Sequence, residues 1–121
     1  MVLIHSGQIS PFADYRWERR IIVIDENMEF AQQQLNQLLD QPDELNDRDL
    51  LVFLKRGKKL ICQNAEEEIL EDIRDRYDGI CLIGKDGGVK LREDSSVDTR
   101  LIFDLIDSMP MRQSEMRKKS N

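Results

Sequence analysis

Three continuous apolar runs predict the central strands of a buried sheet. They lie at 19–25, 49–55 and 80–83, and the first is rich in β-branched residues. Continuous rather than alternating apolarity is typical of strands that are covered on both faces. Residues 89–92 instead alternate apolar and basic side chains, which predicts a fourth strand with one face in water. A turn and a short extended segment at 56–62 follow the second strand.

Apolar residues at helical spacing predict three helices between and after these strands. The first is capped by Asn27, turns its glutamines outward and ends before Pro42. The second spans 64–78 and opens with a capping box. The third opens at Asp98 and stops at Pro110. The stripes predicted to be buried are Met28, Ala31, Leu35, Leu38 and Leu39 in the first helix, Ile69, Leu70, Ile73 and Tyr77 in the second, and Val97, Leu101, Ile102, Leu105, Ile106 and Met109 in the third.

The residues between the last two strands predict a tight hairpin. Asp86-Gly87 is the commonest sequence of a two-residue turn, in which both positions adopt positive φ. The elements therefore follow the order strand, helix, strand, helix, strand, strand, helix. Two parallel crossovers followed by an antiparallel hairpin and a helix predict a thioredoxin-like α/β fold, with a four-stranded mixed sheet and three main helices. A flavodoxin-like fold is the alternative, and the hairpin argues against it.

Length and composition indicate one domain with a charged exterior. The 121 residues suit a single domain, and 40% apolar with 35% charged residues is typical of a soluble protein. We divide the chain into a lead-in at 1–13, the thioredoxin-like domain at 14–111 and a basic C-terminal tail at 112–121, which we expect to be solvated and frayed. The net charge of −6 repels a phosphate backbone, so no nucleic-acid partner is expected.

Membrane insertion and bound metals are not expected. The sequence has no apolar run long enough to span a bilayer, and its start lacks the basic and apolar regions of a signal peptide. The expected location is the cytoplasm for the sequence as written, or the periplasm or the outside of the cell where a leader has been removed. One histidine and two scattered cysteines do not supply the usual ligand spacing of a zinc site, and no cofactor is expected.

Three segments of the chain resemble a known domain family. They are Tyr15-Arg16-Trp17 with Arg20, the hairpin from Gly84 to Arg92, and Met109-Pro110-Met111-Arg112 with Glu115-Met116. From about Pro11 to Arg117 the chain resembles the thioredoxin-like domain called P-DUDES, which occurs in short bacterial proteins and within secreted animal matrix proteins with sushi repeats. The resemblance implies a thioredoxin-like fold with no settled activity. Many bacterial members carry a secretion signal, a pattern from which this chain departs.

Thioredoxin chemistry needs a cysteine of low pKa at the start of the helix after the first strand, usually within Cys-X-X-Cys. Residues 25–28 occupy that position here and contain no thiol. The usual cis-proline is also missing before the third strand, at 76–79. We therefore interpret the chain as a non-catalytic thioredoxin-like binding module. The alternative is a thiol-dependent oxidoreductase or peroxidase-like enzyme that uses a lone cysteine, either Cys62, expected to be exposed, or Cys81, expected to be buried.

The direction of the strands predicts where a binding site would lie. The third strand runs away from the usual thioredoxin active end, so its hairpin and the end of the last helix should meet at the opposite end. The candidate binding residues there are Lys85, Asp86, Lys90, Arg92 and Arg112, for a protein or a small anion. The alternative is mutual packing, with Arg112 paired to Asp86 or Asp107. A further alternative is self-assembly, in which a homodimer forms through the edge of the fourth strand against the resistance of its basic residues. Trp17 is predicted to be a lid on the core.

Overall fold

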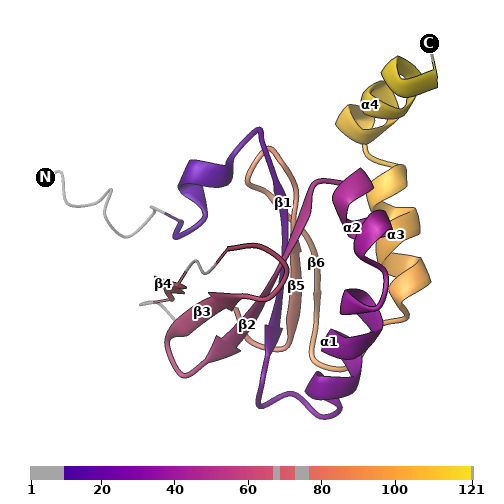
Figure 1. The fold of residues 1–121 in the computed structure, drawn as a ribbon. Helices are drawn as coiled ribbons and strands as arrows, with labels where there is room; N and C mark the ends of the chain where they lie inside the picture. The colour runs from indigo at the N-terminus through magenta and orange to yellow at the C-terminus, as the bar shows by residue number, and fades with distance from the viewer. Residues whose placement is uncertain (1–9, 67–68, 73–76, 121) are drawn as a thin grey trace, which may run out of the picture.

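A six-stranded mixed sheet with helices on one face forms the body of the protein (Figure 1). The computed structural model describes residues 10–66, 69–72 and 77–120. Its elements are η2 (Ala13–Tyr15), β1 (Arg20–Asp25), α1 (Ala31–Leu39), α2 (Pro42–Asp47), β2 (Leu50–Arg56), β3 (Lys59–Cys62), β4 (Ile69–Glu71), β5 (Ile80–Ile83), β6 (Val89–Glu93), α3 (Thr99–Asp107) and α4 (Pro110–Ser120). The strand order is β4-β3-β2-β1-β5-β6. None of the described helices combines the length and apolarity needed to cross a bilayer.

The described sheet contains one parallel pair, β1 with β2, and the other neighbours are antiparallel. Helices α1 and α2 make the crossover between the parallel strands. The second parallel crossover that we expected is wrong, because the chain turns back at Gly57 and pairs β3 against β2. The later strand β5 then runs antiparallel to β1, with Ile80 opposite Ile24. The predicted four strands are therefore part of a larger sheet of six.

The helix expected at 64–78 is replaced, where the structure describes it, by bends and by strand β4. The side chain of Asn64 does not cap a helix. Its Oδ1 accepts a hydrogen bond from the Val52 N–H at 2.8 Å, and its Nδ2 donates to the Leu50 carbonyl at 2.9 Å. Asn64 thus completes the backbone hydrogen bonds of β2. Glu67 and Ile73, which belonged to the expected helix, lie outside the described residues.

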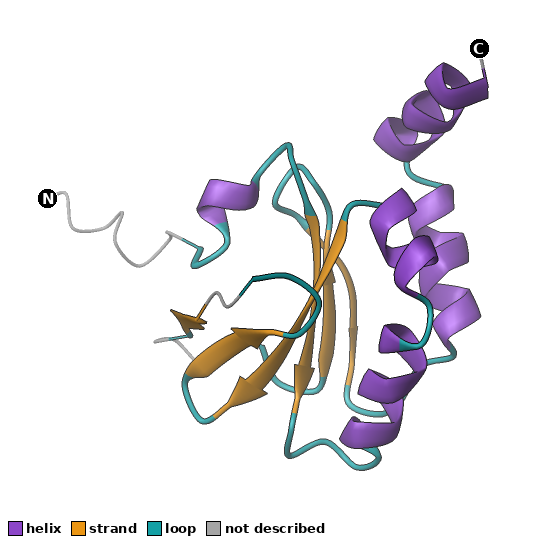
Figure 2. Ribbon diagram, in the orientation of Figure 1, coloured by secondary structure: helices purple, strands orange, loops and turns teal. Residues whose placement is uncertain are grey.

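The sheet separates two apolar layers, and the strands contribute side chains to both. Helices α1, α2 and α3 cover one face, as Figure 2 shows. On the other face Phe12 packs edge-on against Phe53 and Tyr77, with ring centroids 5.0 and 5.3 Å apart. The burial predicted for the apolar residues of the central strand runs and for the α1 stripe is confirmed, except that Leu39 is only partly buried. Three details were wrong: Gln34 is buried and accepts a hydrogen bond from the Val97 N–H, and both Leu101 and Ile69, which were expected to be buried, are exposed.

The first and last predicted helices end before Pro42 and Pro110, as expected, but a further helix that we did not predict begins at each proline. Pro42 and Pro110 each occupy the first turn of a new helix, where the N–H that proline lacks would have no intrahelical partner. The segment expected to be a frayed tail is therefore largely helix α4. Helix α1 begins after Phe30, whose backbone is left-handed, rather than at an Asn27 cap. The cap of α3 is confirmed, because the Asp98 carboxylate accepts from the Arg100 N–H.

The hairpin between β5 and β6 has a longer connection than predicted. The Gly84 N–H donates to the Gly88 carbonyl, and the Gly87 N–H donates back to the Gly84 carbonyl. Gly87 has a φ of +86°, whereas Asp86 does not lie in the left-handed region. These bonds define a three-residue loop, typically a type I turn followed by a glycine bulge. The expected two-residue turn is therefore wrong, although the glycine stands where the positive φ is needed.

Candidate functional site

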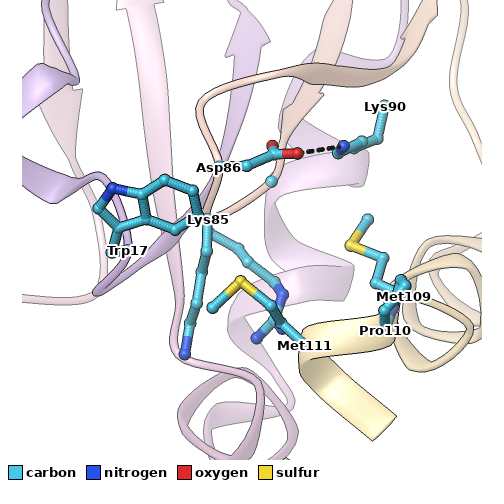
Figure 3. Close-up of a pocket in the computed structure, with 9 residues that line it drawn as sticks. Trp17, Lys85, Asp86, Lys90, Met109, Pro110 and Met111 are labelled. Carbon is cyan, nitrogen blue, oxygen red and sulfur yellow. Dashed lines mark hydrogen bonds and ion pairs between the residues drawn. The ribbon is translucent and has the colours of Figure 1, made fainter. Parts of the chain in front are cut away.

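A cavity of about 360 Å³ opens at the end of the sheet where β1 begins and β5 ends (Figure 3). Three segments that are distant in sequence form its walls. The lining residues are Trp17, Arg20, Gly84, Lys85, Asp86, Lys90, Met109, Pro110 and Met111. This arrangement confirms that the end of the α3 region lies beside the β5–β6 hairpin, as the strand directions predicted.

Trp17 forms one wall and is held outward by its backbone. Its φ is +74°, and its N–H donates to the Lys85 carbonyl at 2.6 Å. Such a conformation in a bulky residue costs on the order of 1–3 kcal/mol. The side chain is 56% exposed, and the Arg16 guanidinium lies 4.9 Å from its ring centroid. The prediction that Trp17 is a lid on the core was therefore wrong.

Met109, Pro110 and Met111 form the apolar wall at the corner between α3 and α4. Met109 also packs against the core beneath the helices, whereas Met111 is 39% exposed and faces the cavity (Figure 3). Methionine side chains are flexible and polarizable, so they adapt to ligands of different shape. The cavity thus has an aromatic wall on a fixed backbone and an adaptable aliphatic wall.

Two cations at the base of the cavity are neutralised by one carboxylate of α4. The Lys85 ammonium donates to Glu115 and to Asp49, each at 2.8 Å. The Arg20 guanidinium is buried and binds both Glu115 oxygens, at 3.1 and 3.2 Å. Burial would raise the pKa of Glu115, but the hydrogen bonds from Arg20 and Lys85 outweigh burial and lower it. Both cations are therefore structural, and Lys85 does not offer a free charge to a ligand.

Arg112 belongs to a second group of ion pairs below the cavity. Its guanidinium contacts Asp107 at 2.9 Å and Asp47 at 2.6 Å, and Arg48 binds the same Asp107 at 2.8 Å. Hydrogen bonds from Lys119 and then Arg112 lower the pKa of Asp47 to about 2. The predicted alternative of mutual packing, with Arg112 paired to Asp107, is confirmed, and its other suggested partner, Asp86, is not the one used.

The remaining candidate residues divide between the rim and the sheet. Asp86 and Lys90 form an ion pair of 2.9 Å along one side of the cavity (Figure 3). The Gly88 N–H and then Lys90 lower the pKa of Asp86. Arg92 lies further along β6, opposite Cys81, and does not line the cavity. The structure therefore brings together three of the five candidates at the cavity, namely Lys85, Asp86 and Lys90. It adds Trp17, Met109 and Met111, which a search for polar residues does not find.

Residues 11–115 match the family model described as Domain of unknown function (DUF4174). The chain belongs to this family. It is also 32% identical over 131 aligned positions to Coiled-coil domain-containing protein 80 of Danio rerio, a match that covers 84% of this chain. The match covers 15% of that protein, so the chain spans a small part of this relative's length. No solved structure matches the chain. The family description names no activity, and the closer assignment to P-DUDES stays a prediction.

Both thiols of this DUF4174 domain lie within the sheet. Cys81 is fully buried, as predicted, and burial raises the pKa of its thiol above the usual range. The expectation that Cys62 is exposed was wrong, because β3 packs between β2 and β4 and the Cys62 Sγ lies 3.7 Å from the Asn64 Oδ1. Within the described ranges, no group of three or more histidine, cysteine or acidic residues is arranged to hold a metal ion.

Proposed function

We propose that this DUF4174 domain is a non-catalytic binding module on a thioredoxin-like scaffold, and that the cavity beside Trp17 is its binding site. The parallel β1–β2 pair, the antiparallel β5–β6 hairpin and the following helix α3 support the thioredoxin-like assignment. In this interpretation β3 and β4 stand where the second helix of the fold was expected. The three segments that resemble P-DUDES all contribute to the cavity, which supports that finer assignment.

The proposal rests on Trp17, a strained and exposed aromatic residue that forms one wall of a cavity. A tryptophan that is 56% exposed on a left-handed backbone gains little burial and costs conformational energy. Strained backbone of this kind clusters at functional sites, where a ligand gains from the side chain that the strain presents. The adjacent concave apolar wall gives such a ligand a place to bind.

The alternative function, a thiol enzyme, has less support. A reactive thiol needs a lowered pKa and access to its substrate. Cys81 has neither, and Cys62 is 6% exposed. The end of β1, where a thioredoxin places its nucleophile, carries Asp25 and Glu26, and a negative charge there disfavours a thiolate.

A dye titration and a thiol titration test the two functions together. Anilinonaphthalene sulfonate should bind the folded chain saturably, and Trp17→Ala should remove that binding. Phe30→Ala is the matched control, because Phe30 is also an exposed aromatic residue on a left-handed backbone, beyond the other end of β1. Equal dye binding by wild type and Trp17→Ala would contradict the proposed site. Both cysteines should react with maleimide much more slowly in the native chain than in urea, and fast native reaction of either one would favour the enzyme.

A further inference from the structure

We infer that the site takes an acidic peptide segment, with one apolar side chain in the cavity and neighbouring carboxylates on Arg16 and Arg19. This inference rests on the proposed function, because it names the ligand class of the same site. It follows from a second cavity, of about 420 Å³, that borders the first. Both cavities are lined by Gly84 and Asp86, and Arg16 and Arg19 line the second.

The charges around the two cavities favour an acidic ligand. Five cations line them, and three of these, Arg20, Lys85 and Lys90, are paired with Glu115, Asp49 or Asp86. The other two, Arg16 and Arg19, are exposed, and neither forms an ion pair with a carboxylate in the described part of the chain. Positive charge therefore exceeds negative charge among the side chains that line the two cavities, in a chain whose net charge is −6; the neighbouring carboxylates Asp14 and Glu18 line neither cavity. Such complementarity selects acidic partners and speeds their association.

The position of Arg16 connects the charged and apolar parts of the site. Its guanidinium lies over the Trp17 ring, at 4.9 Å from the centroid. A stacked guanidinium keeps the N–H groups at its edge, which match the geometry of a carboxylate. A carboxylate of the ligand that binds the Arg16 guanidinium would lie close to an apolar group of the same ligand that packs against Trp17 in the cavity. One ligand therefore needs both an apolar group and a nearby negative charge.

The cavity itself argues against a small inorganic anion as the ligand. The cations at its base are already paired, and Trp17, Met109, Pro110 and Met111 leave apolar surface that an inorganic anion would not cover. A peptide supplies an apolar side chain for this surface and acidic neighbours for the two arginines. Because an apolar anchor in a desolvated pocket carries most of the energy of such contacts, Trp17 should dominate the affinity.

The fluorescence of the chain's single tryptophan, Trp17, reports on the site directly. The probe is acetyl-Glu-Glu-Phe-Glu-Glu-amide, compared with peptides in which serine or lysine replaces every glutamate. We expect saturable binding of the acidic peptide, binding of the serine peptide weaker by on the order of tenfold, and no binding of the lysine peptide. Added salt should weaken the binding of the acidic peptide and leave the binding of the serine peptide unchanged.

The double variant Arg16→Gln/Arg19→Gln separates charge recognition from apolar binding. It should lower the affinity for the acidic peptide by on the order of tenfold, to that of the serine peptide, and leave the serine peptide unchanged. Arg56→Gln/Arg100→Gln, at two exposed arginines elsewhere, is the matched control and should change neither affinity. Circular dichroism melts should confirm that each variant folds.

Several outcomes would overturn the acidic-peptide inference. They are equal affinity for the acidic and serine peptides, an unchanged affinity in the Arg16→Gln/Arg19→Gln variant, and Trp17 fluorescence that changes with protein concentration alone, which would place a second copy in the site. If Trp17-dependent dye binding persists in such a case, the proposed binding site stands and the ligand class is wrong. If dye and peptides both fail to bind, the proposed function fails with the inference.

Discussion

Replacing Glu115 with glutamine tests whether buried charges hold α4 against the rest of the protein. The carboxylate lies between Arg20 and Lys85, whose side chains are 1% and 8% exposed. Glutamine keeps the shape of the side chain and removes its charge. Lys85 retains Asp49, whereas Arg20 retains the Arg48 carbonyl as an uncharged acceptor. The substitution therefore leaves one deeply buried cation without a counterion.

The structure sets the expected magnitude. Breaking a buried ion pair by removing one partner costs about 3–5 kcal/mol. Glu115 is 23% exposed and Lys85 keeps a carboxylate, so we expect the lower end, a loss of roughly 3 kcal/mol in the free energy of unfolding. For a chain of this size, that loss is a fall in Tm of roughly 10 °C.

Urea unfolding followed by circular dichroism measures this loss. The control is Glu29→Gln, at an exposed glutamate with no ion pair to any described residue, which should stay within about 0.5 kcal/mol of wild type. If Glu115→Gln costs less than about 1 kcal/mol, the contact behaves as an ordinary surface pair. That result would refute the conclusion that buried charges hold α4 against the rest of the protein.

Three further predictions concern stability. Hydrogen bonds lower the pKa of Asp47 from 3.8 to about 2, so its stabilisation is complete above pH of about 4 and is lost as pH falls toward 2; Tm measured against pH should drop in that window. Gly79→Ala should lower the free energy of unfolding by more than about 2 kcal/mol, because the new Cβ would lie 2.2 Å from the Glu93 carbonyl oxygen at a φ of +68°. Gly57→Ala, where no atom lies near the new Cβ, should lower it by about 1 kcal/mol, and urea unfolding measures both losses. Asn64→Ala should cost about 1–3 kcal/mol in the same assay, and no loss would show that water replaces its bonds to β2.

The central strands were predictable because each is buried on both faces, and this leaves a continuous apolar run in the sequence. The helix at 64–78 was wrong for a physical reason. Ile69 and Leu70 fit a helical stripe, but Asn64 hydrogen-bonds to the backbone of β2 and the chain continues into an edge strand. A long-range contact of this kind leaves no local pattern, and it overrides local propensity.

Helix α4 and the candidate site also combine features that the sequence predicted with features that it did not. The charged residues of 112–119 indicated a solvated tail, whereas their partners lie up to 95 positions away, as for Glu115 with Arg20. The meeting of the hairpin with Met109–Met111 was predictable, because it follows from strand direction alone. The exposure of Trp17 was not, since it depends on a left-handed backbone that few residues of its size adopt.

The attachment of α4 has a consequence for the width of the site. Among the side chains of α4 whose burial the structure describes, the buried one is Arg112, a charged group. The Trp17 wall of the cavity is fixed by backbone geometry. The Met111 wall belongs to α4, which is attached to the rest of the protein by the ion pairs of Glu115 and Arg112. Protonation of Glu115 and Asp47 in acid would weaken this attachment and free the Met111 wall to move relative to Trp17, whereas salt would screen it little because the cations of these pairs are buried.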